Sequence, residues 1–398
     1  MRRTLLASFW MFLLVGLSVS GQEPASYLPM PIPQWEPATG NDLSNPFLIR
    51  HCMMTNQNDS TAFIDRAFPN QAFSEPFNPG IPVVDEPFPG MKNFTDLSLI
   101  SDPTPYPWCT TVKLFMTFPN SAQFVGSGAM ISPGYVITAG HCVYSQDNGG
   151  WATSITVVPA YNSGNYPFGS ANASYLYSWT GWTTSHDYDW DMGYIDLDSD
   201  IGNTVGWLGF GYNNDDNFYY SNTFHNPGYP AESPYNGSQM YYWYGDYDDV
   251  QTHRLYFTKY CYGGQSGSGS YYKDGSDNRY VYAVLSHQLG TETGHIRITS
   301  DKFNSMYNRI YGVEEKEKTQ GSSLRVFPNP SAGSFCIQGL ENKGILIIQN
   351  VLGEIVFERS LAEKDEQINL SHLPDGLYTV IFQSDDHQRQ TTYLVLAH

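Results

Sequence analysis

The chain has 398 residues, of which 41% are hydrophobic and only 15% charged, and its formal net charge at pH 7 is −19. This length predicts two or three domains with sizeable cores, and the composition argues against disorder for most of the chain. The acidic balance argues against binding to nucleic acid or to an anionic membrane surface, because both carry phosphates that would be repelled. Thirty tyrosines, 36 glycines and 25 prolines favour short strands and turns, so we expect an all-β protein.

The first 20 residues have the pattern of a secretory signal peptide. Two arginines precede an apolar run from Leu5 to Leu17, and the small residues Ser18 and Ser20 stand where a cleavage site is expected. No later stretch is long and apolar enough to cross a bilayer, so we expect export without a transmembrane segment.

Export makes disulfides possible, although five cysteines are few and odd in number: Cys52, Cys109, Cys142, Cys261 and Cys336. Cys109 with Cys142 is the pair we favour, and Cys336 is expected to be buried. No cysteine or histidine spacing fits a metal site. The acidic loops at 213–217 and 246–249 would suit calcium, but solvated loops are the simpler interpretation, so we expect no metal and no cofactor.

Composition divides the remaining chain into four parts. Residues 21–99 are rich in proline, asparagine and phenylalanine without a sustained period, which predicts an extended, weakly structured pro-segment or an ordinary linker. Strand and turn signals then recur as far as Ile298, and apolar residues at helical spacing predict a closing helix at 301–310. Residues 313–323 indicate a solvated linker. Residues 324–398 predict a second β unit, with strands at 335–337, 344–349, 354–359, 367–370, 377–383 and 391–396.

One turn presents a histidine that can exchange protons near neutral pH. The β-branched run Val136–Thr138 predicts a buried strand, which stops at Ala139-Gly140 and delivers His141 beside Cys142. A histidine held in this way is a candidate general base, although a lone histidine in such a place is more often structural.

A carboxylate and a hydroxyl follow at informative positions. Asp191 comes 50 residues after His141, at the entrance of a predicted strand, and is the best candidate to orient the imidazole, with Asp189 the second choice. Ser266 lies in a glycine-rich run at 263–269 that would expose its hydroxyl and point backbone N–H groups inward. Alone, that run also fits a plain loop or a phosphate cradle, but no lysine follows it.

Together, the order His, Asp, Ser resembles the trypsin-like serine proteases, and within them the bacterial glutamyl endopeptidases. The signatures are Thr138-Ala139-Gly140-His141-Cys142 and Gly264-x-Ser266-Gly267, and the likeness covers about residues 100–312. It implies two six-stranded antiparallel barrels, with His141 and Asp191 in the first and Ser266 in the second. Ser266 would be the nucleophile, His141 the general base, and the N–H groups of Gly264 and Ser266 the oxyanion hole.

Two departures from this pattern are visible, and they concern activation and cross-linking. Gln265 stands where the wider family has an aspartate that pairs with the amine freed by activation. The usual partner of a cysteine placed like Cys142 is missing near Gly126.

For specificity, the resemblance places His287 and Cys261 on the walls of the substrate pocket, where an imidazole would favour an acidic side chain. The alternative is a histidine merely packed on its strand.

The C-terminal unit carries a second resemblance. Val326-Phe327-Pro328-Asn329-Pro330, Leu352-Gly353, Leu373-Pro374-Asp375-Gly376 and the final Tyr393-Leu394-Val395 are similar to the C-terminal sorting domain of the type IX secretion system. The resemblance implies a small β-sandwich and either release or attachment at the cell surface, while an accessory binding sandwich is the alternative. The favoured function is a secreted serine endopeptidase made as a zymogen, acting on protein or peptide substrates. A catalytically silent, protease-like surface adhesion or binding protein is the rival.

Overall fold

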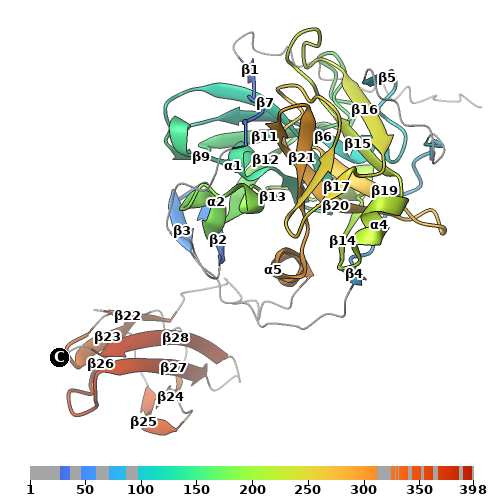
Figure 1. The fold of residues 1–398 in the computed structure, drawn as a ribbon. Helices are drawn as coiled ribbons and strands as arrows, with labels where there is room; N and C mark the ends of the chain where they lie inside the picture. Colours follow the sequence, from blue (N-terminus) through green and yellow to red (C-terminus); the bar gives the residue numbers. More distant parts are fainter. Residues whose placement is uncertain are drawn as a thin grey trace, which may run out of the picture. The chain divides into compact units, whose positions relative to one another are not determined.

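The computed structural model describes residues 27–35, 46–59, 71–86, 97–311, 324–327, 329, 331–338, 343–350, 354–361, 366–384 and 389–396. Its contacts divide the chain into two compact units, Met1–Gly312 and Val313–His398. Strands dominate both units, which confirms the all-β prediction (Figure 1). The predicted signal peptide and the 313–323 linker lie outside the described residues.

Six strands of the first unit form a closed barrel. They run in the order β11-β6-β7-β8-β13-β12, and β11 also pairs with β12, which closes the ring. The barrel core is filled by fully buried aliphatic and aromatic side chains, because successive residues of each strand alternate between interior and exterior. The six strands are β6 (Thr111–Thr117), β7 (Gln123–Ser132), β8 (Tyr135–Thr138), β11 (Ser154–Pro159), β12 (Ala171–Trp179) and β13 (Gly193–Leu197).

The second half of the unit is an open ten-stranded sheet, so the second six-stranded barrel that the resemblance implied is not seen among the described residues. Its main path runs β17-β18-β21-β20-β19-β15-β16-β5, with β14 and β4 joined at its side. The strands that follow the first barrel are β14 (Gly209–Asn213), β15 (Phe224–Gly228), β16 (Met240–Gly245), β17 (Asp249–Val250), β18 (Arg254–Phe257), β19 (Gly269–Lys273), β20 (Arg279–Leu289) and β21 (Glu292–Arg297).

The expected closing helix is present as α5 (Ser300–Tyr311), with Phe303 and Met306 fully buried at helical spacing. No described helix has the length and apolarity needed to cross a membrane. The remaining elements of this unit are short: α1 (Gly140–Val143), α2 (Thr180–Thr183), α3 (Gly202–Val205), α4 (Asp216–Ser221), η1 (Trp108–Thr110), η2 (Gln146–Asn148), η3 (Tyr188–Trp190), β9 (Tyr144–Ser145) and β10 (Gly150–Trp151).

The described parts of residues 21–99 include five short strands that their composition did not predict. β1 pairs with β7, β2 with β12, β4 with β14 and β5 with β16, while β3 pairs with β2. Strands this short add to sheets that other parts of the chain form. Their own sequence is therefore too short to show the alternation of apolar and polar residues that marks a strand. Their bounds are β1 (Leu28–Pro29), β2 (Leu48–Cys52), β3 (Gln57–Asp59), β4 (Gln71–Phe73) and β5 (Ser98–Ile100).

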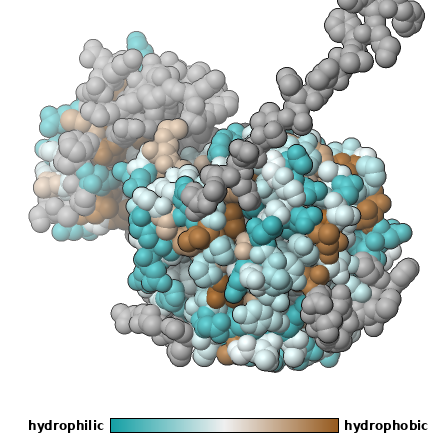
Figure 2. All heavy atoms as spheres, turned by 90° about the horizontal axis from the view of Figure 1, so that it is seen from above, coloured by the Kyte–Doolittle hydropathy of each residue, from teal (hydrophilic) through white to brown (hydrophobic). Residues whose placement is uncertain are grey.

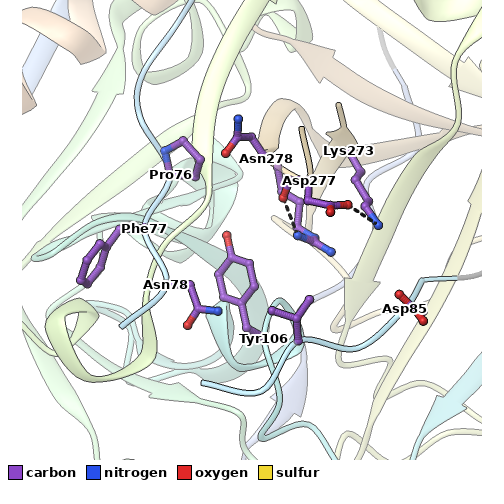
Figure 3. Close-up of a pocket in the computed structure, with 10 residues that line it drawn as sticks. Pro76, Phe77, Asn78, Asp85, Tyr106, Lys273, Asp277 and Asn278 are labelled. Carbon is purple, nitrogen blue, oxygen red and sulfur yellow. Dashed lines mark hydrogen bonds and ion pairs between the residues drawn. The ribbon is translucent and has the colours of Figure 1, made fainter. Parts of the chain in front are cut away.

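A buried ion pair also fastens this segment to the second sheet. Glu86 accepts from Arg279 Nε at 2.5 Å and from Nη2 at 2.7 Å, and both side chains are almost fully buried. Beside it lies a hollow of about 360 Å³ (Figure 3), lined by residues of the segment and of the sheet: Pro76, Phe77, Asn78, Val83, Asp85, Tyr106, Lys273, Asp277, Asn278 and Arg279. None of the predicted site residues lines this hollow. On the face seen in Figure 2, hydrophobic residues form small separate patches among hydrophilic ones.

The C-terminal unit contains two sheets around one core. β22 (Arg325–Phe327), β23 (Ser334–Gln338) and β26 (Glu366–Asn369) form one sheet, and β24 (Gly344–Gln349), β25 (Ile355–Leu361), β27 (Gly376–Ser384) and β28 (Arg389–Leu396) form the other. The six predicted strands are confirmed, and β22 was missed. Cys336 is partly exposed rather than buried as predicted, because its neighbours Phe335 and Ile337 point into the core.

Candidate active site

His141 follows the strand β8, as the sequence predicted, and lies on the four-residue helix α1 where a turn was expected. Its side chain is almost completely buried, and its backbone N–H donates to Asp191 Oδ1 at 2.7 Å. Gly140 makes this approach possible, since a Cβ there would lie only 2.8 Å from the Trp182 ring and 2.9 Å from Asp191 Oδ1. The turn therefore brings the imidazole and the carboxylate together.

Asp191 is fully buried at the end of η3 and is held by three hydrogen bonds. Its Oδ2 meets His141 Nδ1 at 2.8 Å and accepts from the Ser286 hydroxyl at 2.6 Å, in addition to the bond from the His141 backbone. Burial alone would raise the pKa of Asp191, but the His141 imidazole and these donors outweigh it and lower the pKa below its ordinary value. The carboxylate therefore stays charged.

The same pair sets the ionisation of His141. Burial disfavours the imidazolium, yet the Asp191 carboxylate outweighs burial and raises the pKa of His141 above its ordinary value. Asp189, the second choice for the orienting carboxylate, is partly exposed and forms an ion pair with Arg254 at 2.8 Å instead.

Ser266 sits on the glycine turn before β19 and is fully buried. Its carbonyl accepts from the Ser127 N–H at 2.9 Å and meets Cys142 Sγ at 3.7 Å, so the serine turn packs against the turn that carries His141. Among the described residues, neither Ser266 Oγ nor His141 Nε2 has a hydrogen-bonding partner, although both atoms are buried.

Gly264, the first predicted oxyanion donor, has φ +92°, and a Cβ there would lie 2.6 Å from the Tyr229 carbonyl oxygen. Only glycine fits this conformation and this space. Its backbone N–H donates to the Met30 carbonyl at 2.9 Å. The donor is therefore occupied by a carbonyl oxygen from the N-terminal segment.

Comparison with known families agrees with this geometry. The family model of trypsin matches residues 101–306, which is more than half of the chain. The chain belongs to the trypsin family. A second model, described as the secretion system C-terminal sorting domain, matches residues 325–396.

Two curated relatives each match about half of the chain. A Bacillus subtilis protein named extracellular metalloprotease is 36% identical over 216 residues, which are 52% of this chain and 65% of the relative. A glutamyl endopeptidase of Bacillus licheniformis is 30% identical over 227 residues, covering 54% and 66%. This chain thus spans just under two thirds of each relative. A solved structure titled as a Glu endopeptidase in complex with MPD is 23% identical, with a TM-score of 0.47 and coverage of 54% and 98%.

Another contact at this site that the sequence did not predict is made by a second serine. Ser286, on β20, lies 95 residues from Asp191 and donates to it, while its own oxygen meets His287 Nδ1 at 3.0 Å. A carboxylate only accepts, so the Ser286 hydrogen points to Asp191 and the Nδ1–H of His287 must point to Ser286. Only the position next to His287 could have suggested this role.

His287 is fully buried, and its second nitrogen is also engaged. Nε2 lies 3.2 Å from the Tyr256 hydroxyl, which accepts from Arg254 Nη1 at 3.2 Å. Burial lowers the pKa of His287 to about 3, so the ring is neutral and Tyr256 donates to Nε2. Hydrogen bonds therefore run in one direction, from Arg254 through Tyr256, His287 and Ser286 to Asp191.

Cys261, the other predicted pocket residue, is bonded to Gln288, the neighbour of His287. Its thiol donates to Gln288 Oε1 at 3.0 Å, and its backbone N–H donates to the same oxygen at 3.2 Å. Burial raises the pKa of Cys261 to about 12, which keeps the thiol protonated. Gln265 is fully buried, and its Oε1 accepts from the Tyr262 N–H at 2.9 Å.

All five cysteines are free, so the predicted pairing of Cys109 with Cys142 is wrong. Cys109 Sγ lies 3.1 Å from the Val205 carbonyl, whereas Cys142 Sγ faces the Ser266 carbonyl. A Cβ added at Gly126 would lie 3.3 Å from Cys142 Sγ. Gly126 therefore occupies the place of the missing disulfide partner.

Proposed function

We propose that the chain is a serine endopeptidase whose catalytic residues are His141, Asp191 and Ser266. Ser266 Oγ attacks the carbonyl carbon of a peptide bond, and His141 takes the hydroxyl proton and returns it to the leaving amine. Asp191 holds the imidazole through Nδ1 and stabilises the imidazolium. The N–H groups of Gly264 and Ser266 stabilise the oxyanion, and water then hydrolyses the acyl-enzyme.

The observation that carries this proposal is the buried His141–Asp191 pair, with His141 on a turn whose Cys142 packs against the turn of the buried Ser266. The two relatives carry different names, since one is called a metalloprotease and the other a glutamyl endopeptidase. The serine mechanism is favoured by the carboxylate on Nδ1 of His141, which leaves Nε2 free to act as the base.

For substrate preference we propose cleavage after glutamate, with His287 and Cys261 in the pocket. The name of the Bacillus licheniformis relative supports this preference. A neutral His287 has no hydrogen on Nε2, so binding a glutamate carboxylate requires the ring to take up a proton. The buried carboxylate then stabilises the imidazolium through a charge-assisted hydrogen bond.

We further propose export by the type IX secretion system, with the C-terminal unit as the sorting signal and the product secreted or attached to the cell surface. The match of residues 325–396 to a secretion sorting domain supports this route. Removal of the pro-segment near residues 98–102 would complete maturation.

A peptide library incubated with the processed protein tests the activity and its preference. We expect products that end in glutamate, and none with the Ser266→Ala variant. Equal product from the two proteins would refute the peptidase assignment. Cleavage after arginine or large apolar residues would refute only the role of His287.

A further inference from the structure

The N-terminal residues 27–35 lie along the candidate active site and touch both halves of the catalytic unit. At one end, β1 pairs in parallel with β7, and the Met30 N–H donates to the Val125 carbonyl at 2.8 Å (Figure 1). At the other end, the Trp35 N–H donates to the Gln288 carbonyl at 3.0 Å, and the Gln288 N–H donates to the Pro33 carbonyl at 2.9 Å. The segment thus connects β7 of the barrel with β20, next to His287.

The middle of this segment occupies the oxyanion donor. The Met30 carbonyl accepts from Gly264 N–H at 2.9 Å, and Met30 is only 4% exposed. With the segment in place, Ser266 Oγ and His141 Nε2 make no hydrogen bond to each other. The Met30 carbonyl is therefore hydrogen-bonded to the oxyanion donor, while His141 is not hydrogen-bonded to Ser266. The peptide is bound in this arrangement, but the serine is not activated to attack it.

Two features hold the segment in this extended form. Prolines at 29, 31 and 33 fix the backbone before binding, so little conformational entropy is lost on docking. Aromatic contacts anchor both ends: Tyr27 meets the Phe115 ring edge-on at 5.3 Å, and the Arg254 guanidinium lies 5.3 Å from the Trp35 ring.

We propose that residues 27–35 form an inhibitory strand that binds between β7 and β20, parallel to both, with the Met30 carbonyl on the Gly264 donor. This inference rests on the proposed peptidase function. The ligand class is an extended, proline-rich apolar peptide that accepts the hydrogen bond of the oxyanion donor and is not cleaved. We therefore expect a separate peptide with the sequence of this strand to inhibit the peptidase as well.

The test weakens the strand in the intact chain and then restores it. The double substitution Tyr27→Ala and Trp35→Ala should raise hydrolysis of a short glutamyl substrate about tenfold, because two aromatic anchors of this kind together contribute about one factor of ten. Met54→Ala is the matched control, since Met54 belongs to the same N-terminal region but is 94% exposed. Mass spectrometry confirms that each chain remains uncut.

A synthetic peptide of residues 27–35 should then inhibit the weakened chain and remain uncleaved. The same peptide with the Met30 carbonyl reduced to a methylene lacks the acceptor for Gly264 N–H, and should inhibit at least about tenfold more weakly. Cleavage of the peptide, or equal inhibition by the reduced form, would overturn the proposal.

Binding of a fluorescently labelled form of the 27–35 peptide to the weakened chain carrying Ser266→Ala, compared with hydrolysis by the weakened chain that retains Ser266, separates the two claims. Binding that depends on the Met30 carbonyl, together with no hydrolysis by the weakened chain that retains Ser266, would support the strand and refute the peptidase. Ser266-dependent hydrolysis at an unchanged rate in the weakened chain, without peptide binding, would refute the strand alone.

Discussion

Ser286 donates its hydroxyl hydrogen to Asp191 Oδ2 at 2.6 Å, and His141 Nδ1 meets the same oxygen at 2.8 Å. One carboxylate oxygen of Asp191 thus accepts hydrogen bonds from both the imidazole and a serine on the second sheet. Removing the serine hydroxyl leaves the carboxylate more basic, which strengthens its hold on the protonated His141.

We therefore expect Ser286→Ala to move the acid limb of the kcat/KM profile to higher pH and to lower kcat/KM by about tenfold, given about 1.5–3 kcal/mol for a hydrogen bond to a charged group. Ser178→Ala is the control, because Ser178 is equally buried but donates to the Met192 carbonyl. The role of Ser286 is wrong if both variants give the same pH profile.

Asp191→Asn tests the orienting carboxylate itself. Asp191 raises the pKa of His141. As the pH is lowered, the wild type should therefore begin to lose activity while the pH is still above the ordinary pKa of histidine. Without the carboxylate, the acid limb should move to lower pH and kcat should fall on the order of 10⁴-fold, since the tautomer is no longer fixed. Asp189→Asn removes the neighbouring carboxylate, which pairs with Arg254. If Asp189→Asn lowers kcat equally, the assignment of Asp191 fails.

The sequence was sufficient to name His141, Asp191 and Ser266 as candidates, because the strand before the histidine and the glycines around the serine are local signals, and the structure brings the first two into contact. It could not reveal the bond from Ser286, whose partner lies 95 residues away at the end of η3. Residues 27–35 were missed for a related reason. Their hydrogen bonds go to β7, Gly264 and Gln288 rather than within the segment, so no local pattern announces them.

The Cys109–Cys142 prediction failed because both thiols are buried against different backbone carbonyls. The space beside Cys142 belongs to Gly126, and this relation can be tested. Gly126→Cys should form a disulfide with Cys142 and stabilise the unit by about 3 kcal/mol, the value for a loop of roughly this length. The Met116 methyl group, 3.1 Å from the new Cβ, must shift slightly.

Mass spectrometry and thiol counting would detect that bond, and Gly126→Ser provides a control of similar size without a cross-link. Two free thiols in oxidised Gly126→Cys protein would contradict the geometry.

Glu86→Gln should destabilise the catalytic unit by about 3–5 kcal/mol, because it leaves the buried Arg279 without its carboxylate. Burial favours a higher pKa for Glu86, but Arg279 outweighs it and lowers the pKa. The stabilisation is therefore present above the ordinary glutamate pKa and is lost as the pH falls through the lowered value.

Tryptophan fluorescence during denaturant unfolding measures this change, since residues 324–398 contain no tryptophan. The adjacent Asp85→Asn makes the same chemical change at an exposed site and should alter stability by less than about 0.5 kcal/mol. Equal destabilisation by the two variants would contradict the ion-pair account.

His287→Gln should reduce the preference for glutamyl over glutaminyl substrates by about ten- to a hundredfold, because it removes the group that takes up a proton. In the wild type this preference should weaken as the pH rises, since proton uptake by His287 becomes unfavourable. His225→Gln replaces another buried histidine, one stacked on Tyr271. A wild-type preference that is independent of pH would argue against proton uptake.

The most direct measurement of the central claim is the mass of the processed protein after treatment with diisopropyl fluorophosphate, which phosphorylates an activated serine hydroxyl. We expect one adduct, located on Ser266, that forms slowly in Asp191→Asn and is absent from Ser266→Ala. An unmodified Ser266 in the processed protein, or an adduct that forms equally fast in Asp191→Asn, would contradict a nucleophile activated by His141 and Asp191.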